Sequence, residues 1–533
     1  MKTYLNKIVS ILLISFFANS LFSQVTRFQI TYGNNQSNWG SAIPVSDGGY
    51  IIMTEDSTWP ASRDIIMIKT DSIGNIAWTK KYGNTSNTDD TRYYQITEAH
   101  NGGYLIAGAL NATWGPVVSV WIRTDSNGDT VWVKRDMFGS GTLIKTSDGG
   151  YAQVGVSLLK TDSMGNIQWA KIYTAVSGSP TCGQQTADGG YIILGSTGQY
   201  ASGGPTDRDL VLIKTDSVGN IQWTKVYGSP TSMELIILGE GAVVQANDGG
   251  YAILATTSVA YQSLTFDLLF IKTDAAGNLQ WSKTYGGASG DYAADLKATG
   301  AIGYIITGRT IGFEPPLQNS MRSFMMRTDG NGTPVWTKMY GDMANNNYNS
   351  NDEAYYVNYT ADGGFLMSGA TQSFGAGAWD AWLIKTDALG VSGCNEIVTN
   401  PTVTIPTLTI GTGGYDSAVF YTSSPYTIAV GTWQPTKTIL CLNGSLTGEI
   451  DVSENKDDIL IYPNPFTDAV TITSQQEITA IEVYNMLGEL VFSTSNIKHQ
   501  TSNIIDLSSQ PSGIYFVRVT TKEGTVSRKI VRE

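Results

Sequence analysis

Few residues in this sequence could carry out acid–base, nucleophilic or metal chemistry. The 533 residues include two histidines, His100 and His499, and three cysteines. His100 precedes a Gly-Gly turn and His499 lies close to the other end of the chain, so we do not expect them to share a metal. There is no Gly-x-Ser-x-Gly, His-Glu-x-x-His or phosphate-binding Gly-Lys-Ser/Thr loop. We therefore predict no catalytic residue, no metal site and no cofactor.

Carboxylates keep an enzymatic alternative open. A hydrolase or lyase that acts on polysaccharide needs two acids that converge on one bond. A fold with many loops can bring distant acids to one face, although no spacing in the sequence singles out a pair. A polysaccharide hydrolase or lyase therefore stays an alternative to a protein that only binds.

Aromatic and acidic side chains concentrate in segments whose lengths differ between otherwise similar repeats. Variable loops on a fixed scaffold are where binding residues collect, and aromatic rings with acids suit contacts with sugars or proteins. The opposing interpretation is that these rings simply pack onto the surface. The aromatic candidates for ligand binding are Trp59, Trp114, Tyr200, Tyr261 and Phe313, and the acidic candidates are Asp89, Asp90 and Asp352.

The scaffold that would position these loops is a repeat. An Asp-Gly-Gly-Tyr marker with its variants occurs seven times, about 53 residues apart, and a Lys/Arg-Thr-Asp marker also occurs seven times. Trp-x-Lys-x-Tyr-Gly, with some drift in its tail, occurs six times. The first marker begins at Asp47, Asn101, Asp148, Asp188, Asp248, Ala301 and Asp362, the second at Lys69, Arg123, Lys160, Lys214, Lys272, Arg327 and Lys385, and the third at Trp78, Trp132, Trp169, Trp223, Trp281 and Trp336.

The missing seventh copy of the third marker predicts a closed ring. Phe28 to Gly33 resembles the tail of that marker and lies near the N-terminus. A linear solenoid has no use for such a permutation, whereas in a ring one terminus completes the sheet that the other began and removes an exposed edge. We therefore expect an all-β, seven-bladed β-propeller. Its N-terminal strand should pair with the strand that ends at Lys385-Thr386-Asp387.

The repeated turns and tryptophans are expected to be structural. A feature that recurs in nearly every repeat indicates scaffold, and each turn offers too few carboxylates for a calcium site. The third marker resembles the tryptophan repeat of quinoprotein-like propellers, and the repeats are also kelch-like, so these families suggest a blade shape but no chemistry. Turns such as Asp71-Ser72-Ile73 are similar to a bacterial O-glycosylation signal, although turn chemistry alone explains them.

Composition and charge agree with an extracellular β-protein. Charged residues make up 15% and aromatic residues 11% of the chain, and there are 58 glycines, which excludes disorder and coiled coils. The net charge of −13 argues against a nucleic-acid partner. Cys394 and Cys441 flank a β-like segment and could form a disulfide in an exported protein, which would leave Cys182 as a buried free thiol.

The two ends of the chain predict export. Residues 1–23 have the lysines, apolar run and small residues of a signal peptide, and no apolar stretch approaches the ~20 residues of a membrane span. Near the other end come Tyr462-Pro463-Asn464-Pro465, then Val483-Tyr484-Asn485, then Asp506-Leu507-Ser508, and a closing Lys529-Ile530-Val531. In this order they resemble the C-terminal sorting domain of type IX secretion. The resemblance implies a small β-sandwich over 459–533, the type IX machinery as partner, and transport through the periplasm and outer membrane.

Together these patterns predict four segments and one function. We expect a signal peptide at 1–23, a propeller at 24–394, a β-rich segment and linker at 395–458 and the sorting domain at 459–533. We expect a secreted or cell-surface propeller that binds carbohydrate or protein through its loop face. A structural surface or adhesion protein is the third alternative.

Overall fold

The structure is a computed structural model in which the described residues form β-strands, turns and loops. The all-β prediction is confirmed for these residues. The described ranges are 25–34, 40–58, 62–83, 89–112, 117–135, 137, 141–155, 157–174, 176, 182–198, 207–236, 241–258, 265–299, 303–313, 320–343, 350–376, 378–412, 416–418, 424–425, 429–431, 434–442, 445–446, 459–463, 466–474, 477–485, 490–495, 502–521 and 524–532.

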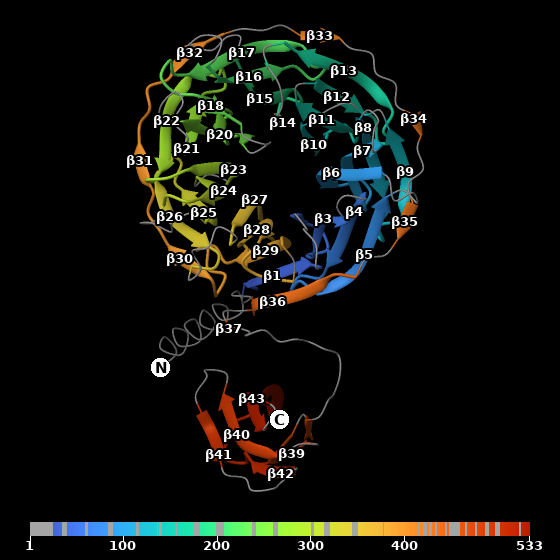
Figure 1. Ribbon diagram of the computed structural model, residues 1–533, viewed down its shortest axis with the longest axis vertical. Coiled ribbons are helices and arrows are strands. Elements are labelled where there is room, and N and C mark those ends of the chain that lie inside the picture. Colours follow the sequence, from blue (N-terminus) through green and yellow to red (C-terminus); the bar gives the residue numbers. More distant parts are fainter. Residues whose placement is uncertain are drawn as a thin grey trace, which may run out of the picture. The chain divides into compact units, whose positions relative to one another are not determined.

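The chain divides into two compact units, Met1–Ile450 and Asp451–Glu533. In the first unit, successive antiparallel sheets, here called sheet units one to seven, follow one another around a ring (Figure 1). In order along the chain they are β2 (Ser41–Pro44), β3 (Tyr50–Thr58), β4 (Ser62–Thr70) and β5 (Ile76–Gly83); β6 (Asp89–Glu98), β7 (Tyr104–Ala112), β8 (Val117–Thr124) and β9 (Thr130–Arg135); β10 (Gly141–Lys145), β11 (Tyr151–Gly155), β12 (Ser157–Thr161) and β13 (Ile167–Tyr173); β14 (Cys182–Gln185), β15 (Tyr191–Thr197), β16 (Asp209–Thr215) and β17 (Ile221–Gly228); β18 (Glu234–Leu235), β19 (Ala242–Gln245), β20 (Tyr251–Ser258), β21 (Phe266–Thr273) and β22 (Leu279–Gly286); β23 (Asp291–Ala298), β24 (Tyr304–Thr310), β25 (Arg322–Thr328) and β26 (Pro334–Tyr340); and β27 (Asp352–Tyr359), β28 (Phe365–Thr371), β29 (Asp380–Thr386) and β1 (Phe28–Gly33).

The N-terminal strand completes the last sheet unit. β1 pairs antiparallel with β29, with Phe28 opposite Lys385 and Tyr32 opposite Ala381. The predicted pairing of Phe28–Gly33 with the last repeat is therefore confirmed. Sheet units one and two are themselves joined by a single parallel bridge between Arg63 and Asp90.

Neighbouring sheet units are joined by one recurring contact. The repeated Trp lies against the glycine of the next unit's Asp-x-x-Gly turn, so that a Cβ on Gly277 would lie 2.8 Å from the ring of Trp223. The Tyr that follows in the same strand donates its hydroxyl hydrogen to the carbonyl of that glycine, as in Tyr227 to Gly277 at 2.6 Å. The same Tyr–Gly bond joins Tyr32 to Gly74, Tyr82 to Gly128, Tyr173 to Gly219, Tyr285 to Gly332 and Tyr340 to Gly390.

Residues 396–442, here called the strap, add a strand to the outer edge of each sheet unit. Its strands pair with β26, β22, β17, β13, β9, β5 and β1 in turn, so the strap runs backwards around the ring (Figure 1). A disulfide joins Cys394, just before the strap, to Cys441 at its end, with the two Cα atoms 6.1 Å apart. The strap thus covers edges that would otherwise expose unpaired backbone groups. Its strands, and the short one after it, are β30 (Glu396–Val398), β31 (Thr402–Thr404), β32 (Thr409–Gly411), β33 (Asp416–Ala418), β34 (Ser424–Pro425), β35 (Ala429–Gly431), β36 (Thr436–Leu442) and β37 (Ser445–Leu446).

The second unit contains two antiparallel sheets with one apolar core. Their strand orders are β38-β39-β42 and β41-β40-β43-β44. Val470 and Ile472 of the first sheet join Ile481, Val483 and Val517 of the second in one buried cluster. The strands are β38 (Ile459–Tyr462), β39 (Ala469–Ser474), β40 (Ile478–Asn485), β41 (Leu490–Ser495), β42 (Ser502–Asp506), β43 (Gly513–Thr521) and β44 (Gly524–Arg532).

The contact between Trp223 and Gly277 predicts a difference between two similar substitutions. Gly277 and Gly249 both have positive φ, +75° and +81°, but a Cβ on Gly249 meets nothing nearer than 4.0 Å. Gly277→Ala should therefore lower the free energy of unfolding by about 1–3 kcal/mol more than Gly249→Ala, because only the first overlaps a ring. Urea denaturation of both variants measures this, and equal losses would contradict the packing role of Trp223.

The disulfide predicts that the strap stabilises the ring. Replacing both Cys394 and Cys441 by Ser should lower the free energy of unfolding by about 2–4 kcal/mol, because a loop of 47 residues is no longer closed in the unfolded chain. Reductant should shift the denaturation midpoint of the wild-type protein and leave that of the double variant unchanged. An unshifted wild-type midpoint in reductant would show that the cross-link contributes nothing.

Candidate functional site

Most of the predicted ligand-binding side chains lie outside the described part of the structure. Trp59, Trp114, Tyr200 and Tyr261 lie outside the described residues, and they remain predictions. Asp89 and Asp90 belong to β6, where they pair with Ala112 and Asn111, but their side chains are also outside the described part.

Phe313 is a packing residue, which corrects its prediction as a ligand-binding ring. It is 6% exposed, and its ring centroid lies 4.9 Å from that of Phe324. Its backbone N–H donates to Thr310 Oγ1 at 3.0 Å, which turns the chain inward directly after β24. An apolar ring gains more from this buried cluster than from a position in water.

Asp352 is likewise inside the protein, which corrects its prediction as an exposed polar partner. Its carboxylate is 0% exposed and accepts hydrogen bonds from Thr371 Oγ1 at 2.5 Å and Ser373 Oγ at 2.8 Å. The guanidinium of Arg322 lies 3.6 Å away. Burial raises the pKa of Asp352 to about 6. Asp352 thus fastens the connection after β28 to the start of β27.

Asp291 does the same for sheet unit six. It accepts hydrogen bonds from Thr310 Oγ1 and from the N–H of Gly287 at 2.8 Å. Burial raises the pKa of Asp291 to about 7. Because two acids at matching positions hold two matching loops, their role is to fix the backbone and not to form a catalytic pair.

A second charged group on the inner strands is also internally paired. Arg309 Nη1 donates to Glu353 Oε2 at 2.8 Å, and the hydroxyl of Tyr355 donates to the same oxygen at 2.7 Å. The Arg309 guanidinium also lies 5.2 Å from the ring centroid of Tyr292. These two opposite charges satisfy each other.

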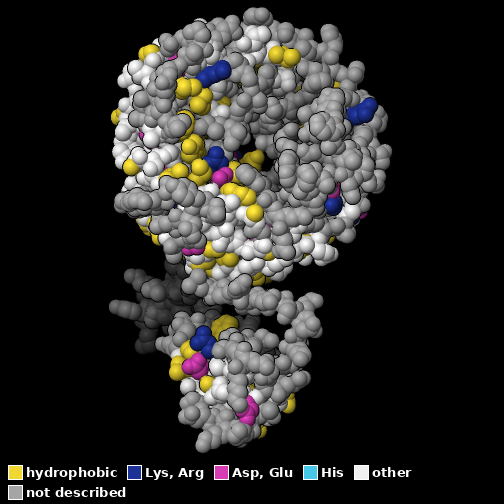
Figure 2. All heavy atoms as spheres, viewed as in Figure 1, with side chains coloured by type: hydrophobic (Ala, Val, Ile, Leu, Met, Phe, Trp, Pro, Cys, Tyr) yellow, Lys and Arg dark blue, Asp and Glu magenta, His cyan; other side chains and the backbone are white. Residues whose placement is uncertain are grey.

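Figure 2 shows that apolar side chains gather on one side of the ring, over the sheets that contain β20 to β28.

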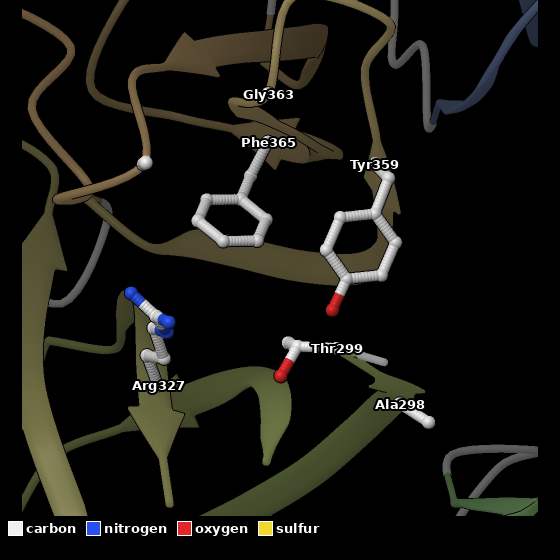
Figure 3. A pocket seen from close by; sticks show the side chains of 7 residues that line it. Ala298, Thr299, Arg327, Tyr359, Gly363 and Phe365 are labelled. Atoms are coloured by element: carbon white, nitrogen blue, oxygen red, sulfur yellow. The ribbon is translucent and has the colours of Figure 1, made fainter. Parts of the chain in front are cut away.

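A pocket of about 360 Å³ opens between sheet units six and seven. It lies at the end of the sheets that carries the short turns. Its lining comes from β23, β25, β27 and β28, from the turns after β23 and β27, and from the turn after β29. The Arg327 guanidinium, the Phe365 ring and the Tyr359 ring surround the same space (Figure 3). The lining residues are Ala298, Thr299, Arg327, Tyr359, Gly363, Phe365 and Ala388.

In most repeats the position of Arg327 is held by a lysine that is neutralised within its own sheet unit. In unit five, Lys272 Nζ lies 2.7 Å from Asp248 Oδ2 and also donates to Thr273 O and Gln280 Oε1. The same Lys–Asp pair joins Lys69 to Asp47, Lys160 to Asp148, Lys214 to Asp188 and Lys385 to Asp362. Since these pairs recur, they belong to the scaffold.

Sheet unit six has lost both side-chain partners of this cation. By repeat position, Ala301 stands where Asp248 stands in unit five, and Val335 stands where Gln280 stands. Among the described residues, the Arg327 guanidinium has neither a hydrogen bond nor an ion pair. A half-buried positive charge that no described residue pairs with is costly, so this position is suited to an anion from outside.

The arginine of sheet unit two shows that the substitution alone does not make a site. Arg123 occupies the same repeat position but is only 9% exposed. Its Nη2 donates to the carbonyls of His100 at 3.0 Å and Gly102 at 2.6 Å. Unit two therefore satisfies its arginine internally, whereas Arg327 lines the pocket and has no hydrogen bond or ion pair to the part of unit six that the structure describes.

Two aromatic rings form the apolar side of the pocket. Phe365 is buried, and Trp336 holds it edge-to-face at 6.0 Å between ring centroids. Tyr359 is 37% exposed and its ring lies 5.5 Å from that of Phe365. Burial raises the pKa of Tyr359, so its hydroxyl stays protonated and can donate. The motifs considered in the sequence did not include these residues, although the joint absence of Asp and Gln beside Arg327 is visible in the repeats.

Other chemical groups offer no competing site in the described part of the chain. No cluster of three His, Cys, Asp or Glu side chains that could hold a metal occurs there. Burial raises the pKa of the Cys182 thiol to about 12, so the reactive thiolate is suppressed. Among the described residues, no helix is long and apolar enough to cross a membrane.

The buried Asp291 predicts a specific pH dependence of stability. Its pKa is raised on folding, so between about pH 4 and pH 7 the folded state holds more protons than the unfolded chain, and its contribution to stability falls as pH rises. In Asp291→Asn this contribution is absent. The stability difference between wild type and variant should therefore shrink or reverse between pH 4 and pH 7. Denaturant titrations at both pH values measure it, and a constant difference would contradict the assignment.

Comparisons with known proteins identify the C-terminal unit. Residues 460–533 match the family model described as "Secretion system C-terminal sorting domain". No curated protein matches the chain. Among solved structures, a mannose phosphorylase from Leishmania mexicana in complex with phosphate is 9% identical, with a TM-score of 0.29, over 56% of this chain and 84% of that one. The extracellular domain of a putative one-component system from B. thetaiotaomicron is 11% identical, with a TM-score of 0.16, over 96% and 99%.

The motifs at the end of the chain and the family match agree with each other. The four motifs in register, the two-sheet unit and the matched family model cover the same residues. The domain implies interaction with the type IX secretion machinery, and the protein is secreted or attached to the outer-membrane cell surface. Residues 460–533 are a type IX secretion C-terminal sorting domain.

Proposed function

We propose that the ring is a seven-bladed β-propeller formed by residues 24–394 and bound by the strap. Three observations support this: the sheet units follow the sequence repeat, β1 supplies the outer strand of the last unit, and the same Trp–Gly and Tyr–Gly contacts recur between neighbours. Full closure of this kind removes exposed sheet edges.

We further propose that this propeller is an exported ligand-binding module for carbohydrate or protein. The observation that carries the proposal is the pocket between the sixth and seventh blades, where a guanidinium and two aromatic rings surround one cavity. Small-molecule sites have this composition, with an apolar lining and a few polar groups. The predicted loop residues Trp59, Trp114, Tyr200 and Tyr261 remain candidates for additional contacts.

The enzymatic alternative receives less support. A glycoside hydrolase needs two carboxylates that face an open site. The described acids Asp291, Asp352 and Glu353 instead accept hydrogen bonds or pair with arginine inside the protein. A binding role explains the pocket without requiring such a pair.

A substitution in the pocket tests the proposed function. Tyr359→Ala in the secreted protein should weaken binding on a glycan and protein array by about tenfold or less, because one exposed ring contributes on the order of 1 kcal/mol. Its melting temperature should stay close to that of wild type. Val218→Ala, which also removes an exposed apolar side chain from a turn, is the control and should bind normally. Unchanged binding by Tyr359→Ala would reject the pocket as the ligand site.

A further inference from the structure

We propose that the pocket at Arg327 binds a sugar acid, with the ligand carboxylate on the guanidinium and the sugar ring against Tyr359. This inference rests on the proposed binding function and names the class of ligand. It combines a cation that has no hydrogen bond or ion pair among the described residues, an exposed aromatic ring and the hydroxyl of that ring, all of which border one cavity.

The charge of the ligand follows from the repeat. In five blades the cation at this position is a lysine that pairs with an aspartate of the same blade. In blade six the position of that aspartate is held by Ala301. The guanidinium of Arg327 presents a flat fork of N–H donors, which matches the two oxygens of a carboxylate. A bound carboxylate would supply the charge that Asp248 supplies to Lys272.

The number of charges on the ligand is limited by the rest of the protein. The chain carries a net charge of −13, which disfavours the approach of a polyanion. The pocket lining contributes a single cation. A ligand that presents a single carboxylate to the pocket therefore fits better than nucleic acid or a heavily sulfated chain.

The uncharged part of the ligand follows from the other lining residues. Tyr359 offers an exposed ring face of the kind on which the C–H groups of a sugar pack. The hydroxyl of Tyr359 points toward the Thr299 side of the pocket (Figure 3). It can exchange hydrogen bonds with a ring hydroxyl, which a purely apolar carboxylate would leave unused. A volume of about 360 Å³ lies in the range of small-molecule sites.

Calorimetric titration of the full secreted protein tests the inference. The probes are D-glucuronate, D-glucose, acetate and sulfate. We expect D-glucuronate to bind at least about tenfold more tightly than each of the other three. Arg327→Gln should weaken D-glucuronate binding by about tenfold or more, and Arg327→Lys should weaken it less, because the charge is kept but the planar fork is lost.

Two control variants separate binding from folding. Lys283→Gln removes a positive charge from β22, where Lys283 donates to Thr333 of a turn in sheet unit six, and should leave D-glucuronate binding unchanged. Arg123→Gln removes the arginine that is satisfied internally, so it should lower the melting temperature without changing affinity. Arg327→Gln should weaken D-glucuronate binding and leave the melting temperature close to that of wild type.

Three outcomes would overturn the inference. They are no binding of D-glucuronate by the wild-type protein, binding of acetate or sulfate as tight as that of D-glucuronate, and binding of D-glucuronate that survives Arg327→Gln. If D-glucuronate fails while array ligands still depend on Tyr359, the sugar-acid inference is wrong and the proposed binding function stands. If array binding is also independent of Tyr359, both are wrong.

Discussion

The ring depends on the contact between a tryptophan and a turn glycine of the next sheet unit. At this point the backbone approaches the indole so closely that a Cβ would overlap it, and the glycine has the positive φ that the turn requires. The adjacent tyrosine then bonds the same glycine's carbonyl, which would otherwise be buried without a partner. The turn glycine thus determines the turn, the packing against the indole and the hydrogen bond to the tyrosine. Its repetition sets how units one to six sit against the next one, and Ile30 takes the place of the indole against Gly74 where the last unit meets the first.

The strap adds a second level of restraint. Each unit ends in an outer strand whose free edge could pair with another chain, and the strap pairs with that edge. At the join between the last and first units, Lys437 of the strap donates to Asn75, the contact that Lys225 makes to Asn278 elsewhere. The strap therefore also supplies the lysine that β1 lacks, since β1 has Ile30 at the repeat position of Lys225. The Cys394–Cys441 disulfide holds the strap's two ends together where the ring itself is completed.

The pocket arises where the repeated pattern changes. The lysine pairs show that a buried cation is tolerated when an aspartate and backbone carbonyls neutralise it. In sheet unit six these side-chain partners are replaced by Ala301 and Val335, while the cation remains as Arg327. Arg123 donates to backbone carbonyls of its own unit, whereas Arg327 at the same repeat position lines the pocket and has no hydrogen bond or ion pair among the described residues.

The sequence by itself determined the all-β class, the repeat and its permutation, and the sorting domain, because periodic spacing and ordered motifs are local properties of the chain. The pairing of Phe28–Gly33 with β29 followed from a missing marker, and no long-range geometry was needed. Only the tertiary structure decided where the strap lies, since strands of two or three residues carry too little pattern to name their partners. It also decided that Phe313 and Asp352 face inward, because an aromatic or acidic residue in a loop has the same sequence signature whether it is buried or exposed. The pocket joins Arg327 to Tyr359 and Phe365 across two sheet units, and such a contact exists only after the units pack side by side.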